Sequence, residues 1–426
     1  MNTANLSTDQ APPLAVPLTW YALVPLAVVV AGALLLVQGS RLLATGWLQP
    51  TAGLAHLGTL GLLGAAMAGS LYQVVPVVAG APVPGPRLAH AAAGVFGLGT
   101  AALVYGLVAG EPQALRWAAW LLGAALVAVV LQVGAALAKS TVKEPSVYGM
   151  KLALLSLVAV AGLGLRLAWG RATGQLPMDR QVLLTAHLAL GLLGWVGALL
   201  AAMSWQLVPM FWLAAAPPAH WPKNYLRILT FFLTLVLALT LLGAPWLGVA
   251  LAATPAALLV WVVQPWHLWR QLQARRRKKS EPSLQLWQLS LLCGPLTFVA
   301  AGLLVVLEWG PLGPLFGWLA VWGWAGAAIH SALSKIVPFL AWFQRFTQTG
   351  DRPELQARVP PMKQLLRDQQ LRLGLYSHSA ALVLGIAAIL SGFDPLAQLT
   401  GLAVALTGLL LAGELSVPVW RAWRVR

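Results

Sequence analysis

The chain has 426 residues, of which 59% are hydrophobic and only 9% are charged, and its mean hydropathy is +0.78. Soluble proteins carry about a quarter charged residues, so this composition excludes an ordinary soluble enzyme and indicates an integral membrane protein. The single cysteine, Cys293, excludes a disulfide framework, an iron–sulfur cluster and a thiolate zinc site.

Apolar runs along the chain predict the membrane spans. A helix needs about 20 apolar residues to cross the hydrocarbon core. Twelve such runs can be drawn, at roughly residues 18–38, 53–80, 88–109, 114–137, 148–169, 182–212, 224–243, 246–268, 285–307, 313–343, 371–392 and 396–416. The sequence therefore predicts an all-α polytopic membrane protein with twelve transmembrane helices.

The net charge of +16 reflects the distribution of Lys and Arg among the loops. Cytoplasmic loops are enriched in these residues. If the N-terminus is cytoplasmic, the basic run 275–279 and most other basic residues fall on the inner side. The outer side then holds only Arg41, Arg116, Arg166, Arg171 and Arg180. We therefore expect both termini in the cytoplasm, a lipid bilayer around the chain and no nucleic-acid partner.

An internal repeat organises the spans. The sequence AHLG followed by GLLG around His56 in the second span recurs as AHLA followed by GLLG around His187 in the sixth. Pro76, Pro209 and Pro338 occupy matching places in the second, sixth and tenth spans. We interpret the chain as a single membrane domain of three repeats, approximately 18–137, 148–268 and 285–416. Since four spans is an even number, the repeats keep one orientation, which predicts pseudo-threefold symmetry about the membrane normal.

One segment resembles a known family. Residues 72–82 (YQVVPVVAGAP), followed by PRLA at residues 86–89, are similar to the segment after helix 2 of haem–copper oxidase subunit I. That family also has twelve helices in three groups of four. Its helix 2 opens with a histidine that ligates the low-spin haem, and His56 stands at that place. The resemblance implies a haem–copper oxidase subunit I-like fold and a haem b cofactor, with copper as a further candidate.

Other motifs of that family are absent. The copper-site signature His-Pro-Glu-Val-Tyr of helix 6 and the histidine pair after helix 7 do not occur. The level of the family's His-x-His on helix 10 is occupied by residues 317–320, Gly-Trp-Leu-Ala. The resemblance therefore implies a divergent member without a complete dinuclear oxygen-reducing centre, similar to the nitric-oxide-response haem–copper membrane proteins. It is not a complete terminal oxidase, and whether it is an enzyme stays open.

The histidines are the main candidate ligands. Ionisable side chains within a membrane are costly and are functional candidates by default. His56 and His187 lie at matching depths near the outer side and are candidate axial haem ligands. The alternative for each is a histidine that forms a hydrogen bond to a neighbouring helix. His330 and His378, near the inner side, form a second candidate pair for a metal or a proton path, or a polar cluster that joins helix ends.

Acidic residues are few, and the apolar run of the last span places Glu414 at its end. No carboxylate is then expected in the middle of the membrane, which argues against a proton pump. We expect a haem-binding and metal-binding protein of a bacterial inner membrane, in electron transport or in nitric oxide or metal handling, with other membrane or cytochrome subunits as candidate partners. The alternative is a cofactor-free transporter or structural subunit on the same scaffold.

Overall fold

The computed structural model describes residues 10–46, 48–175, 179–350 and 352–424, and in these residues all regular secondary structure is helical. Twelve helices in the described part are long and apolar enough to cross a membrane, as the sequence predicts. The spans are α1–η2 (Ala15–Leu43), α2–η3–α3 (Gln49–Ala79), α4 (Pro86–Ala109), α5 (Pro112–Lys139), α6 (Pro145–Thr173), α7–η4–α8 (Arg180–Trp212), α9 (His220–Leu241), α10–η5–α11 (Trp246–Gln273), α12 (Pro282–Val306), α13–η6–α14 (Leu312–Thr347), α17 (Asp368–Ser391) and α18 (Asp394–Arg424).

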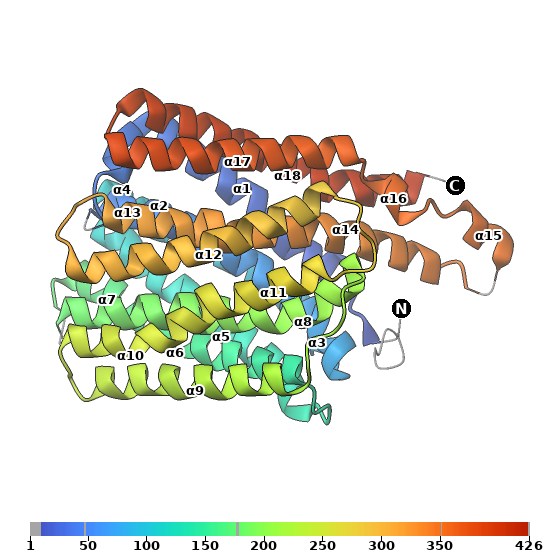
Figure 1. Cartoon of the computed structure of the whole chain (residues 1–426), viewed down its shortest axis with the longest axis horizontal. Helices are drawn as coiled ribbons and strands as arrows, with labels where there is room; N and C mark the ends of the chain where they lie inside the picture. Colours follow the sequence, from blue (N-terminus) through green and yellow to red (C-terminus); the bar gives the residue numbers. More distant parts are fainter. Residues whose placement is uncertain (1–9, 47, 176–178, 351, 425–426) are drawn as a thin grey trace.

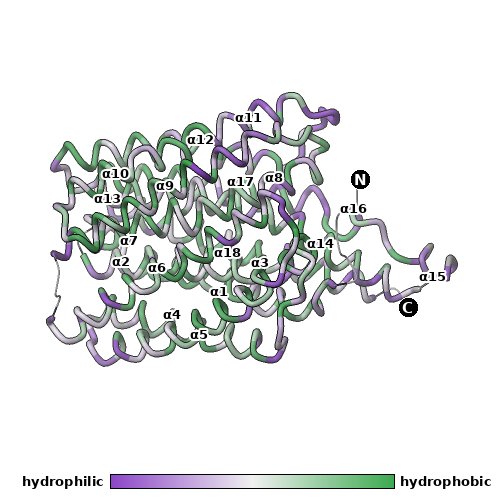
Figure 2. The backbone as a smooth tube through the Cα atoms, turned by 90° about the horizontal axis from the view of Figure 1, so that it is seen from below, coloured by the Kyte–Doolittle hydropathy of each residue, from purple (hydrophilic) through white to green (hydrophobic). Residues whose placement is uncertain are grey.

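The helices run side by side along one axis of the molecule (Figure 1). Apolar residues follow the helices, and hydrophilic residues gather toward their ends (Figure 2). Two short helices, α15 (Pro353–Arg358) and α16 (Met362–Leu365), lie beyond the bundle in the loop between α14 and α17. They are at the end of the bundle where α1 begins and α18 ends, which the topology predicted from basic residues makes the cytoplasmic end.

Proline and glycine set the helix boundaries. Pro86, Pro112 and Pro282 stand in the first turn of α4, α5 and α12, where the missing N–H costs no hydrogen bond. Gly110 and Gly392, which follow α4 and α17, have positive φ angles of 71° and 65°. A residue without Cβ adopts this left-handed conformation at little cost. These residues explain why neighbouring spans are joined by very short turns.

Three spans form the centre of the bundle. The spans Gln49–Ala79, Arg180–Trp212 and Leu312–Thr347 are 78%, 72% and 72% buried over their most apolar window, whereas none of the other nine exceeds 50%. These are the second, sixth and tenth spans, the same three in which the sequence repeats the proline. The remaining spans lie outside them and expose apolar side chains that suit lipid.

Each central span contains a π-helical segment of eight residues, namely η3 (Leu57–Gly64), η4 (Leu190–Gly197) and η6 (Leu319–Gly326). Each segment begins with leucine, ends with glycine and stands at the same distance before its proline. A shorter one, η5 (Leu259–Val263), interrupts the eighth span. Long π-helices are rare and are frequent at functional sites, so their recurrence supports the internal repeat and draws attention to this level of the bundle.

The glycine at the fifth place of each π segment makes an equivalent contact. A Cβ on Gly194 would stand 2.6 Å from Ser156 Oγ of α6, and one on Gly323 would stand 2.9 Å from Cys293 Sγ of α12. Gly61 meets Ala27 of α1 in the same way. Small residues let membrane helices approach closely. Each central span therefore packs at this level against the span that precedes it in the chain.

The first and last spans close the bundle. A Cβ on Gly401 of α18 would lie 2.6 Å from the Leu36 backbone nitrogen, and one on Gly408 would lie 2.8 Å from that of Val29. Gly32 of α1 is in similar contact with Ala405. The two helices thus touch through their backbones, and dispersion along this glycine-lined contact holds the ends of the chain together.

Candidate functional site

His56 is the last residue of α2 (Gln49–His56), directly before the π segment η3. Its ring Nδ1 lies 2.7 Å from the carbonyl oxygen of Ala52, one turn earlier. Since a carbonyl only accepts, the hydrogen bond assigns the ring proton to Nδ1. The lone pair of Nε2 is then free, and no described residue provides it with a hydrogen-bond partner.

His187 is held in the same way by a different helix. It lies in α7 (Arg180–Ala189), seven residues after the helix start, as His56 does in α2. Its Nδ1 donates to the carbonyl oxygen of Val160 on α6, 3.1 Å away. The ring packs against Gly164, where a Cβ would come within 2.8 Å of its Cε1. Again, Nε2 has no hydrogen-bond partner among the described residues.

The two imidazoles face each other across the central spans. Their ring centroids are 6.2 Å apart and their planes are inclined by 29°. The sequence predicts a common depth for these residues but not their proximity. Histidines that ligate metals characteristically donate one ring N–H to a carbonyl or carboxylate, which orients the other nitrogen toward the metal. Both His56 and His187 have this arrangement.

Both rings line a large cavity in the half of the bundle away from the end where α1 begins and α18 ends, which is called the outer half after the predicted topology. The cavity has a volume of about 1490 Å³, and its walls are mainly Leu, Ala, Val, Gly and aromatic side chains. The rings are half-buried although they lie among helices, because the cavity reaches them. It extends from the level of Trp261 and Trp322 to the outer helix ends, where Gly46, Gly174 and Glu308 line it.

Two arginines stand at the outer end of the cavity. Arg171, near the end of α6, and Arg180, which begins α7, both line it. The two guanidinium groups are close enough to repel each other electrostatically. Seven residues separate Arg180 from His187 on one helix, a rise of about 10 Å. A ligand that reached from His187 to the cavity mouth would place anionic groups favourably beside these cations.

The residues fit a haem with two axial histidines. When two imidazoles bind one iron through nitrogens at about 2 Å each, their centroids lie about 6 Å apart, close to the separation observed. Small-molecule pockets typically have about 300–1,000 Å³, so the cavity has room for a macrocycle. The outer arginines suit its propionates. No group of three or more His, Cys, Asp or Glu in the described residues is placed to hold a metal ion, so the copper prediction gains no site.

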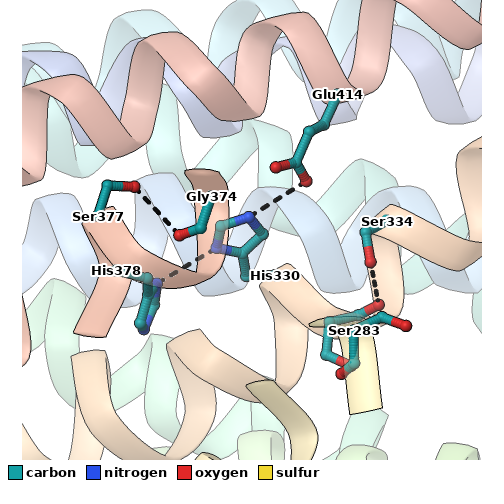
Figure 3. A network of polar contacts seen from close by, with 8 residues as sticks. Ser283, His330, Ser334, Gly374, Ser377, His378 and Glu414 are labelled. Carbon is teal, nitrogen blue, oxygen red and sulfur yellow. Dashed lines mark hydrogen bonds and ion pairs between the residues drawn. The ribbon is translucent and has the colours of Figure 1, made fainter. Parts of the chain in front are cut away.

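His330 and His378 also lie together, but their nitrogens are engaged (Figure 3). His330 Nδ1 is 3.3 Å from His378 Nδ1, and His330 Nε2 is 3.2 Å from Glu414 Oε2. His378 Nε2 donates to the Trp322 carbonyl at 3.2 Å. A metal ligated by either ring would have to replace these bonds. A metal at His330 and His378 therefore stays a prediction from the sequence. The observed contacts are those of the alternative, a polar cluster that joins helices.

Glu414 is the functional candidate that the sequence analysis missed. The expectation that it ends the last span is wrong, because α18 continues for ten residues to Arg424, and Glu414 is only 2% exposed. The signal was present in the helical spacing. Thr407, Leu411, Glu414 and Pro418 follow one another at intervals of three or four residues, and all are buried on one face.

Comparison with models of known protein families gives no match for this chain, and no curated protein matches it. The functional argument therefore depends on the geometry of the chain itself.

Proposed function

We propose that this protein is a haem b-binding membrane protein in which His56 and His187 are the two axial ligands. The observation that carries the proposal is the pair of imidazoles, 6.2 Å apart in one cavity, each with Nδ1 bonded to a carbonyl and Nε2 without a partner. Haem would supply one-electron chemistry there. The protein holds the two imidazoles, surrounds the macrocycle with apolar walls, and places Arg171 and Arg180 where propionates would end.

The ligand set favours electron transfer. If His56 and His187 both held the iron, the haem would supply one-electron transfer there rather than binding of oxygen or nitric oxide. The apolar lining of the cavity suits transfer of an electron at a site whose ligands stay in place. A role in binding nitric oxide would require one histidine to leave. We therefore place electron transport before nitric oxide or metal handling.

We further propose the haem–copper oxidase subunit I-like grouping for the fold, without the dinuclear centre, in the inner membrane of a bacterium with both termini in the cytoplasm. The buried second, sixth and tenth spans, each with an eight-residue π segment before its proline, support three like-oriented groups of four. The resemblance around residues 72–89 supports the same grouping. Cytochrome or other membrane subunits are the partners that electron transfer would require.

The test is an optical and haem analysis of the protein purified in detergent. We expect one haem b per chain with the Soret and α bands of a six-coordinate low-spin haem. His56→Ala and His187→Ala should each remove or convert this spectrum to a high-spin form. His90→Ala is the matched control, since His90 bonds to Thr19 and does not line the cavity. A full-length protein that binds no haem after expression with added haem precursor would refute the proposal.

The same cavity supports the alternative function. A volume of about 1490 Å³ that reaches the outer helix ends also suits a transporter in an outward-open form. A transporter would require the cavity to open toward the cytoplasmic end in a second state. Purified protein without haem, together with accessibility of cavity positions from both sides of the membrane, would favour this alternative over the haem protein.

A further inference from the structure

The buried chain formed by Glu414, His330 and His378 is separate from the His56–His187 site. The three side chains come from α18, α14 and α17, and each is at most 2% exposed. In Figure 3 they form a continuous line of contacts, with His330 between the other two. The cost of burying three ionisable groups in a membrane protein makes such a cluster a functional candidate.

The hydrogen bonds determine where the protons lie. His378 Nε2 must carry a proton, because its partner is the Trp322 carbonyl. In the neutral ring, His378 Nδ1 is then an acceptor, so His330 Nδ1 carries the proton of the bond between them. His330 Nε2 and Glu414 Oε2 therefore share a single proton. The cluster holds this proton with no net charge.

The surroundings favour the proton on Glu414. Its Oε1 is buried and has no hydrogen-bond partner in the part of the chain that the structure describes, and Gly374, whose missing side chain makes room for it, offers no donor there. A carboxylate with one such oxygen would be poorly solvated, whereas a carboxylic acid loses little. Lys335 of α14 is 2.5 Å from Glu281, which also pairs with Arg277, so its charge is already matched by that carboxylate. The serines Ser331, Ser334 and Ser377 donate to backbone carbonyls.

His378, at the other end of this line of three side chains, lies beside the cavity. The His378 ring stacks on Trp322 with centroids 4.4 Å apart and planes inclined by 11°, and Trp322 Nε1 donates back to the His378 carbonyl at 3.1 Å. Trp322 itself lines the cavity. A protonated imidazole in this position would gain from the face of the indole. His378 is thus one aromatic ring away from the space that His56 and His187 face.

We propose that Glu414, His330 and His378 form a buried proton relay that answers a negative charge entering the cavity. The proton on Glu414 Oε2 passes to His330 Nε2, and the proton on His330 Nδ1 passes to His378 Nδ1. One O–H and one N–H bond break, two N–H bonds form, and no electron is transferred. The transfers leave a negative charge on the Glu414 carboxylate and a positive charge on the His378 imidazole, which stacks on Trp322 beside the cavity. An electron on a bound cofactor and an anionic ligand would draw the proton equally, so the relay does not depend on haem.

The relay is tested by infrared spectroscopy of the full-length protein in lipid nanodiscs. We expect the C=O stretch of a protonated carboxyl group that shifts in D2O and on labelling with ¹³C-glutamate. Glu414→Gln should remove this band, and Glu281→Gln, which changes the carboxylate paired with Lys335, should keep it. A band that survives Glu414→Gln would overturn the proposal. If Glu414→Gln does not fold, the labelled but otherwise unchanged protein still tests the assignment. A labelled protein that shows no shifted carboxyl band would also overturn the proposal.

Coupling along the chain is tested with His378→Phe. Phenylalanine preserves the stacking on Trp322 but removes the acceptor of the His330 Nδ1 proton, which makes His330 Nε2 less basic. The Glu414 C=O stretch should therefore shift to higher frequency. Ser377→Ala, which alters a neighbouring hydroxyl bonded to the Gly374 carbonyl, should leave the band in place. An unshifted band in His378→Phe would refute the relay and leave three unconnected side chains.

Discussion

A methyl group on Gly164 should act directly on the proposed haem ligand. The Cβ of Gly164→Ala would stand 2.8 Å from His187 Cε1. Carbon atoms in ordinary contact are about 3.5–4.0 Å apart, so the ring must move by about 0.7–1.2 Å. Metal–ligand distances tolerate only about 0.2 Å. We therefore expect haem affinity to fall at least about 10–100-fold, the usual effect of disturbing the residues that orient a metal ligand.

Gly162→Ala on the same helix is the matched control. Nothing lies within 4 Å of a Cβ at Gly162, and both substitutions improve helix propensity by up to about 1 kcal/mol. The assay is titration of haem into the purified apoprotein, followed at the Soret band, with the thermal unfolding midpoint measured in parallel. Equal haem affinity of the two variants, with both folded, would refute the assignment of His187 as a ligand.

Three further changes have expected outcomes. Gly385→Ala would drive a methyl group into the Trp318 ring and should lower the free energy of unfolding by about 1–3 kcal/mol, whereas Gly413→Ala, with open space around it inside α18, should raise it by up to about 1 kcal/mol in the same thermal unfolding assay. Tyr72→Phe removes the hydroxyl that donates to Gln132 Oε1 at 2.7 Å and should cost about 1 kcal/mol in denaturant unfolding; no change would show that water replaces the tyrosine. Lys335→Met should destabilise the protein by about 1–2 kcal/mol, because Glu281 would then have Arg277 as its one cationic partner within the described ranges. This is less than the cost of breaking a fully buried pair. Recovery of the lost stability in the double variant with Glu281→Gln would confirm the pairing.

The number of spans was predictable, and their ends were not. Apolar length alone identifies all twelve spans. It fails at helix ends that continue into less apolar or polar sequence. The tenth span was expected to end at residue 343 and ends at Thr347, and the last was expected to end at 416 and ends at Arg424. The second of these errors hid Glu414, because a hydropathy average does not distinguish a helix end from one buried face of a longer helix.

The residues of the candidate site could be picked out from the sequence, but their assembly could not. The repeat places His56 and His187 at one depth, since each stands at the eighth position of its span. Their separation depends on how the second and sixth spans pack, and no spacing within one span encodes that distance. The carbonyl partners show the same limit. Ala52 is one turn before His56 and follows from helix geometry, but Val160 belongs to another helix and required the fold.

The three π segments stand at one level of the bundle. Before this level, on the side where the second span begins, the central spans surround the cavity, and beyond it they pack against their neighbours. Each segment contains a surplus residue compared with α-helical pitch. Deleting one residue from η3, η4 or η6 (Leu57–Gly64, Leu190–Gly197 or Leu319–Gly326) would remove that surplus, so the segment would return to α-helical pitch while the parts of the span before and after it keep nearly the same relative rotation. The surplus residue is therefore absorbed within each segment, and the residues before it that line the cavity keep the same face of the span whether or not the segment is π-helical.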